Sequence, residues 1–137
     1  MTADESLAAF GIVPKDEALP AIRALLAREA QLERQGHDRE PDLALLCCVQ
    51  LFASGHSEDI LAIWDAKQAG MDLSVYLDVQ FLCGMGLAEA KQYLASQSSE
   101  PAVAALAYLE RCEAAGDFEG FTPGSYLANY REYFRVA

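Results

Sequence analysis

Two stretches decide the predicted fold, Asp42-Leu43-Ala44-Leu45-Leu46-Cys47-Cys48-Val49-Gln50-Leu51 and Asp72-Leu73-Ser74-Val75-Tyr76-Leu77-Asp78-Val79-Gln80-Phe81. The second follows the first at an offset of 30 residues (72 minus 42), and Asp, Leu, Val and Gln recur in the same places. An offset of this size is the length of one helix-turn-helix unit, and stacked units bury apolar faces that one pair alone leaves exposed. The sequence therefore predicts a repeat-like helical core over residues 42–95.

The whole chain has the size and composition of a single helical domain. Its 137 residues are enough to bury a core. Ala and Leu dominate and β-branched residues are few, which favours helices over a sandwich or barrel. We expect one all-α domain over residues 1–137, with about seven helices in a right-handed stack similar to HEAT or tetratricopeptide arrays. A compact bundle would give the same apolar periodicity, so the sequence leaves both packings open.

The residues before the core predict two helices. Thr2 and Glu5 have the spacing of a capping box, and a short helix should end at Gly11. Asp16 is the expected N-cap of a second, amphipathic helix that closes at Gly36.

The first half of the core predicts a buried helix followed by a half-buried one. Residues 43–53 are apolar nearly all round, as expected for a helix enclosed by neighbours. Ser57 should cap the next helix, which buries Trp64, exposes Lys67 and stops at Gly70.

The second half of the core is ambiguous. Asp72 is an expected N-cap, but residues 73–83 alternate apolar and polar side chains as a half-buried strand does. We predict a helix, because a lone strand has no partner in this chain and the matching stretch 42–51 does not alternate. A shorter helix is predicted over residues 87–95.

The C-terminal part predicts two more helices. Ser99 should cap a helix that ends near Gly116. Aromatic residues then recur at helical spacing, and they predict a helix over residues 125–136 that caps the open end of the stack. These residues are Tyr126, Tyr130, Tyr133 and Phe134.

No motif in the sequence predicts catalysis, a metal site or a cofactor. His37 and His56 each lie in a polar turn, outside any zinc-ligand spacing. Ser57, His56 and Asp59 adjoin one another, but a helix start explains their proximity better than a catalytic triad. An enzyme would need Asp78 or Glu89 with a shifted pKa beside His56, and the spacing does not require this.

The cysteines and the N-terminus indicate where the protein resides. The four cysteines lie in apolar surroundings without Cys-x-x-Cys spacing, so we expect core thiols in a reducing compartment. They are Cys47, Cys48, Cys83 and Cys112. The N-terminus has no secretory pattern and no apolar run is long enough to cross a bilayer, so we expect a soluble, cytoplasmic protein that binds no membrane.

Polar residues inside the core helices admit two interpretations. Gln50 and Gln80 occupy equivalent places, and we expect their amides to tie neighbouring helices together. Asp78 either shares this structural role or lines a groove and meets a cationic group of a ligand.

The formal net charge of −11 argues against nucleic acid as a partner, because phosphate binding requires a basic face. Between residues 43 and 90, Lys67 is the only basic residue among six acids. An acidic surface either keeps the protein soluble or binds a basic protein partner. The candidate partner-binding residues are Glu58, Asp59, Asp65, Asp72 and Asp78. Exposed Tyr76 would add a hot spot, whereas helical spacing favours core positions for Trp64 and Tyr93.

Several short stretches resemble small bacterial helical proteins. They include Val49-Gln50-Leu51-Phe52, Ile63-Trp64-Asp65-Ala66-Lys67 and Asp78-Val79-Gln80-Phe81-Leu82-Cys83-Gly84-Met85-Gly86-Leu87, within residues 43–118. Acidic single-domain proteins of this kind resemble immunity proteins of bacterial toxin systems, which bind and occlude a cognate toxin. The resemblance implies non-enzymatic protein binding and transfers no site residues. The alternative is a structural or regulatory subunit that self-associates through the aromatic C-terminal helix.

Overall fold

The computed structural model describes residues 1–40 and 42–136, and these residues form eight α-helices and three short 3-10 helices, with no strand among them. The helices are α1 (Ala3–Phe10), η1 (Asp16–Ala18), α2 (Leu19–Arg34), α3 (Leu43–Ser54), η2 (Ser57–Asp59), α4 (Ile60–Lys67), α5 (Met71–Tyr76), η3 (Val79–Cys83), α6 (Leu87–Ala95), α7 (Glu100–Ala114) and α8 (Pro123–Tyr133). The prediction of an all-α chain with about seven helices is confirmed.

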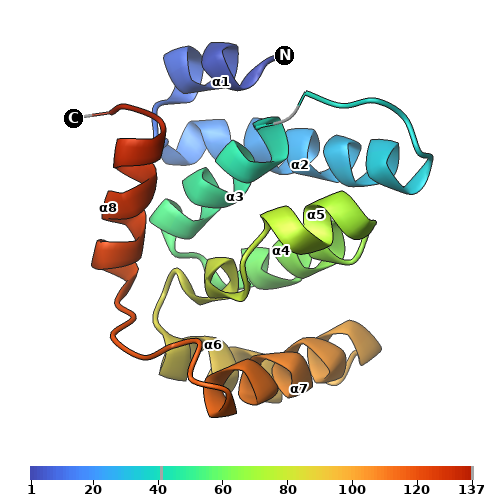
Figure 1. Ribbon diagram of the computed structural model, residues 1–137, viewed down its shortest axis with the longest axis vertical. Helices are drawn as coiled ribbons and strands as arrows, with labels where there is room; N and C mark the ends of the chain where they lie inside the picture. Colours follow the sequence, from blue (N-terminus) through green and yellow to red (C-terminus); the bar gives the residue numbers. More distant parts are fainter. Residues whose placement is uncertain (41, 137) are drawn as a thin grey trace.

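The helices form layers that follow one another in chain order (Figure 1). Helix α1 lies at one end, then come α2 with α3, then α4 with α5, and α6 with α7 lie at the other end. Helix α8 runs along one side of these layers and packs against α3. The aromatic C-terminal helix thus begins at Pro123 and flanks the stack, whereas the sequence led us to expect it over the open end.

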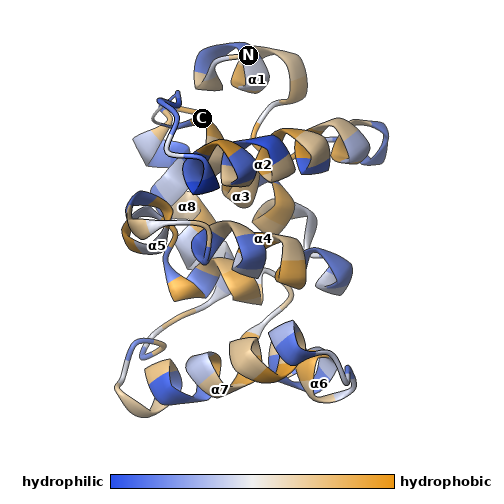
Figure 2. Cartoon of the chain, turned by 90° about the vertical axis from the view of Figure 1, so that its right-hand side faces the viewer, coloured by the Kyte–Doolittle hydropathy of each residue, from blue (hydrophilic) through white to orange (hydrophobic). Residues whose placement is uncertain are grey.

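Helix α3 is the centre of the core, as its composition predicts. Every residue from Leu43 to Phe52 is buried, including the three polar or sulfur-bearing side chains of Cys47, Cys48 and Gln50. Helix α2 carries hydrophilic and hydrophobic residues in alternating patches, as an amphipathic helix does (Figure 2). None of the helices within residues 1–40 and 42–136 has both the length and the hydropathy of a transmembrane segment.

Several predicted helix ends are confirmed by their hydrogen bonds. Thr2 and Glu5 form the predicted capping box, and α1 ends at Gly11. The Ser99 hydroxyl accepts a hydrogen bond from the N–H of Ala102 at the start of α7. Gly36 follows α2 with a φ of +71°, a left-handed conformation that glycine adopts without strain.

Three predicted N-caps are wrong. Asp72 lies inside the first turn of α5, whose N-cap is Gly70. Asp16 and Ser57 each open a 3-10 turn and neither side chain caps a helix, so α2 begins at Leu19 and α4 at Ile60. Backbone bonds within the turns replace the predicted side-chain caps, for example from the N–H of Asp59 to the carbonyl oxygen of His56 at 3.1 Å.

The prediction of one continuous helix over residues 73–83 is also wrong. Helix α5 ends at Tyr76, the backbone is extended at Leu77 and Asp78, and the 3-10 helix η3 follows. The extended residues let Leu77 and Val79 both reach the core while Asp78 faces solvent, which is the alternation seen in the sequence. The two matching stretches therefore share a sequence pattern but differ in backbone conformation.

The segment after η3 also touches α3 closely. A Cβ atom on Gly84 would lie 2.4 Å from the carbonyl oxygen of Phe52, so only glycine fits here. The phenyl ring of Phe81 meets that of Phe52 edge-on, with ring centroids 6.2 Å apart. This close packing holds η3 and the segment after it against α3.

The two glutamines do link separate segments, as predicted, but in different ways. The Gln50 amide donates to the carbonyl oxygen of Gly11 at 2.9 Å and so joins buried α3 to the end of α1. The Gln80 amide donates to the carbonyl oxygen of Asp117 at 2.8 Å and joins η3 to the segment after α7.

Candidate protein-interaction surface

Two of the predicted partner-binding acids are held by an arginine of α2. The Arg23 guanidinium donates to both carboxylate oxygens of Asp59, at 2.7 and 3.1 Å, and to Glu58 at 3.5 Å. The hydrogen bond to Asp59 raises the pKa of Arg23. Asp59 is only 3% exposed. This carboxylate therefore stabilises the contact between α2 and η2, and a partner does not reach it.

Asp65 and Asp78 also have partners within the chain. Asp65 forms an ion pair with Arg34, the last residue of α2. The Asp78 carboxylate accepts hydrogen bonds from the hydroxyls of Tyr126 at 2.8 Å and Tyr130 at 3.4 Å, which attach α8 to the start of η3. Four of the five predicted acids thus have partners within the chain, three on α2 and one on α8.

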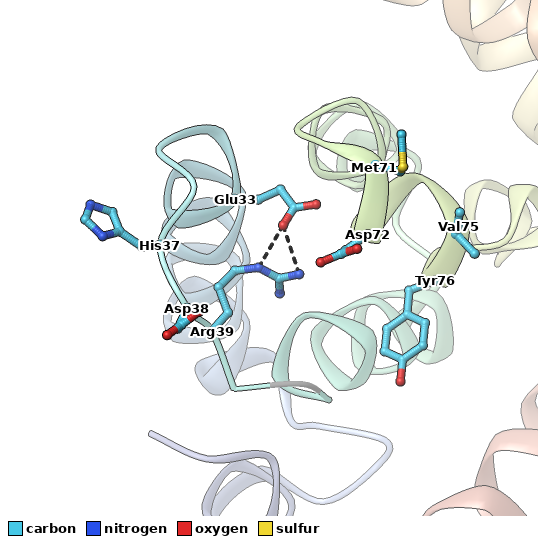
Figure 3. A pocket seen from close by; sticks show the side chains of 8 residues that line it. All are labelled: Glu33, His37, Asp38, Arg39, Met71, Asp72, Val75 and Tyr76. Atoms are coloured by element: carbon cyan, nitrogen blue, oxygen red, sulfur yellow. Dashed lines mark hydrogen bonds and ion pairs between the residues drawn. The ribbon is translucent and has the colours of Figure 1, made fainter.

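Asp72 differs from the other four acids. Within residues 1–40 and 42–136 its carboxylate has neither an ion pair nor a hydrogen bond. It lies in a cavity of about 670 Å³ between α5 and the segment that follows α2 (Figure 3). The cavity is lined by Glu33, His37, Asp38, Arg39, Met71, Asp72, Val75 and Tyr76. We call this cavity the α5 groove.

The α5 wall of the groove is exposed and carries two apolar side chains besides Asp72. Met71 is 83% exposed and Val75 is 75% exposed, and both side chains extend away from the core (Figure 3). Tyr76 is exposed as well, as its predicted role at an interface requires. Trp64 and Tyr93, in contrast, pack into or against the core, as their helical spacing indicated.

The N-terminus of α5 is capped by a residue of α2. The Glu33 carboxylate accepts a hydrogen bond from the N–H of Leu73 at 3.0 Å. The first N–H groups of a helix have no partner within the helix, and they carry the positive end of its dipole. Because Gly70 precedes α5, the Glu33 side chain can approach the backbone there; a Cβ on Gly70 would lie 2.6 Å from it.

The C-terminus of α5 is capped by Lys67 of α4. Its ammonium donates to the carbonyl oxygens of Ser74 at 2.7 Å and Leu77 at 2.5 Å. Our prediction of an exposed Lys67 is wrong, since the residue is 5% exposed, and burial lowers the pKa of the ammonium. The sequence could not indicate this, because the carbonyl oxygens that accept hydrogen bonds from Lys67 are free only where α5 ends, at Tyr76. A six-residue helix is thus held at both ends by charges of the favourable sign.

The opposite wall of the groove is built on Arg39. Its guanidinium donates to Glu33 at 3.2 Å and to Glu29 at 3.4 Å, and the Arg39 side chain is only 8% exposed (Figure 3). This buried cluster ties the segment after α2 back onto α2. His37 and Asp38 are exposed on that segment and form the polar edge of the groove.

Replacing Lys67 tests how α5 is held. Lys67→Met keeps the apolar stem but leaves two carbonyl oxygens without their donor, and we expect a loss of about 2 kcal/mol of unfolding free energy. Hydrogen exchange should accelerate most over residues 71–77. Lys91→Met is the matched control, because Lys91 lies at the surface and pairs with the exposed Glu113. Equal protection of residues 71–77 in Lys67→Met and wild type would show that Lys67 does not hold α5.

The buried cysteines do not offer a reactive thiol at neutral pH. Burial raises the pKa of Cys47 and of Cys83 to about 12, and it raises that of Cys48 well above its ordinary value. The thiolate is the reactive form, so these residues serve as apolar core groups, as predicted. Among residues 1–40 and 42–136, no three His, Cys, Asp or Glu side chains are grouped in a way that would hold a metal ion.

Comparison of the chain with protein-family models, with curated proteins and with solved structures gave no significant match.

Proposed function

We propose that this protein is a non-enzymatic protein-binding module whose α5 groove binds a basic protein partner. Its most specific form would be an immunity protein that occludes a bacterial toxin. One observation carries the proposal: Met71 and Val75 are exposed on a short helix whose two ends are both fixed by residues from other helices.

The exposure of these two side chains is costly unless a partner covers them. Burying a Met or Val side chain yields about 1.5–3 kcal/mol. Neighbouring exposed apolar groups beside a hollow are typical of protein-interaction sites. The capping by Glu33 and Lys67 keeps α5 ordered in the absence of a partner, so that binding loses little conformational entropy.

Charge indicates which partner fits. Asp38 and Asp72 lie in the groove without an ion pair in the described part of the chain, whereas Arg39 is buried against two glutamates. The chain carries a net charge of −11, so it attracts basic proteins and repels acidic ones. A toxin that acts on nucleic acid needs a basic face, and an acidic inhibitor would compete for that face. Such an inhibitor would act in the cytoplasm.

The test is co-expression with the product of the adjacent gene, followed by affinity purification, mass spectrometry and calorimetry. Three forms of the protein serve as bait: the wild type, the groove variant Met71→Ser/Val75→Ser, and the control Val103→Ser. Val103 is an exposed apolar residue on α7, far from the groove in the chain, and so matches the chemistry of the change.

We expect a one-to-one complex with a basic protein that both wild type and Val103→Ser form and that the groove variant forms at least about tenfold more weakly. Affinity should fall as salt rises. A protein that binds no partner and self-associates instead would contradict the proposal. It would favour a structural subunit, with exposed Tyr133 of α8 as the first residue to replace.

A further inference from the structure

The exposed surface of α5 has the relief of a helix-packing surface. Met71 and Val75 are four residues apart, and Asp72 and Tyr76 are four residues apart. Side chains at this spacing form parallel ridges on a helix, with a shallow groove between them. All four of these side chains line the α5 groove, and all four residues are exposed.

From this relief we infer that the segment bound in the α5 groove is a basic amphipathic α-helix of the partner, with an apolar pair four residues apart seated on Met71 and Val75. This inference rests on the proposed function and specifies its partner. Helices that interlock ridges of this kind cross at about −50° with their axes about 8–10 Å apart. An extended segment is disfavoured, because residues 1–40 and 42–136 contain no strand whose edge it would join.

The charges around the apolar pair specify the rest of the helix. Asp72 lies beside Met71 on α5, and Asp38 lies on the facing segment, so Lys or Arg residues on one side of the partner's apolar pair would meet these two carboxylates. A second copy of this chain does not fit, because its own α5 would bring Asp72 against Asp72 and two chains of net charge −11 together. Opposite charge gives the partner helix both its orientation and a fast association rate.

The probe is a synthetic peptide of about 15 residues with Leu at helical spacing and Lys at the remaining positions. Two control peptides have the same length: one carries Glu in place of Lys, and one has the same composition with Leu and Lys strictly alternating. Each is titrated into the full-length protein while backbone amide chemical shifts are followed by heteronuclear NMR.

We expect saturable shifts from the helical Lys peptide that are largest at Asp38 and over residues 71–76. Met71→Ser/Val75→Ser should weaken this binding at least about tenfold, and Val103→Ser should leave it unchanged. Asp38→Asn/Asp72→Asn should weaken binding of the helical Lys peptide several-fold and reduce its salt dependence. Glu110→Gln, at an exposed residue of α7, is the control and should leave binding unchanged. The Glu peptide should not bind.

Three results would overturn the inference: no saturable shift with the helical Lys peptide, equal binding of the alternating peptide, or unchanged binding to the groove variant. These failures are distinct from failure of the proposed function. If the partner captured by co-expression still needs Met71 and Val75 for binding, the groove is the binding site and only the inference of a helical segment is wrong. If that partner binds the groove variant as tightly as wild type, the groove itself is not the binding site.

Discussion

The protein should unfold steeply as the pH rises above 9.0, the ordinary pKa of a cysteine thiol. Burial raises the pKa of Cys47 and Cys83 to about 12 and that of Cys48 well above 9.0. Between these values the unfolded chain has released its thiol protons and the folded chain retains them. Stability is therefore fully present below pH 9.0 and falls as the pH rises towards the folded-state pKa.

The size of the effect follows from the number of thiols. Each contributes about 1.4 kcal/mol per pH unit within this window, so the three together remove about 4 kcal/mol per pH unit. A domain of ordinary stability should therefore unfold near about pH 11. Burial also raises the pKa of Tyr126, which adds to the loss. The lowered pKa of Lys67 acts in the opposite direction, but one lysine does not offset three thiols.

Urea unfolding followed by circular dichroism at a series of pH values, under reducing conditions, measures this slope. Cys47→Ala should be less stable at neutral pH. Its unfolding free energy should nevertheless fall less steeply at alkaline pH than that of the wild type, by about 1.4 kcal/mol per pH unit. Val49→Ala is the matched control, because it removes buried volume from the same helix without removing a titratable group. An identical slope in Cys47→Ala and Val49→Ala would show that the thiol does not cause the alkaline loss.

The sequence predicted the core of the fold well because the deciding signals are local. Helix α3 follows from an apolar run, and its burial requires no knowledge of its neighbours. Two helix caps join residues only three positions apart, Thr2 with Glu5 and Ser99 with Ala102. Signals of this range lie within a single stretch of sequence and can be recognised there.

The candidate site was harder to predict because its deciding contacts are distant in sequence. The N–H of Leu73 binds Glu33, which lies 40 positions earlier, and Asp59 binds Arg23, which lies 36 positions earlier. Counting acids therefore gave a face of five carboxylates, of which four have partners within the chain. Of the predicted site residues only Asp72 lies in the α5 groove, and Met71 and Val75 were missed. The spacing of four residues between Met71 and Val75, beside Asp72, is a signal that the sequence does contain. Val75 also belongs to the alternation of apolar and polar residues over 73–83, which indicates a buried side chain instead.

Loss of Arg39 should destabilise the protein by about 3–5 kcal/mol. Arg39→Met would leave Glu29 and Glu33 without their cation, and both carboxylates are nearly buried. Removing one partner of a buried ion pair is costly, because the remaining charge stays in a medium that solvates it poorly. The loss should appear in urea unfolding at neutral pH. Arg28→Met replaces an exposed arginine of α2 and should change the unfolding free energy by less than about 0.5 kcal/mol.

A double-mutant cycle separates the ion cluster from simple packing. If the uncompensated charge of Glu29 causes the loss, Glu29→Leu/Arg39→Met should be more stable than the sum of the two single changes predicts, by about 1–3 kcal/mol. Additive effects would mean that Arg39 is not coupled to Glu29 and that the charge of Glu29 does not cause the loss. The same cluster supports the groove, because Glu33 bonds both Arg39 and the N–H of Leu73 at the start of α5. Arg39→Met should therefore also weaken binding of the helical Lys peptide, although Arg39 carries the same sign of charge as the peptide and its removal would otherwise strengthen binding.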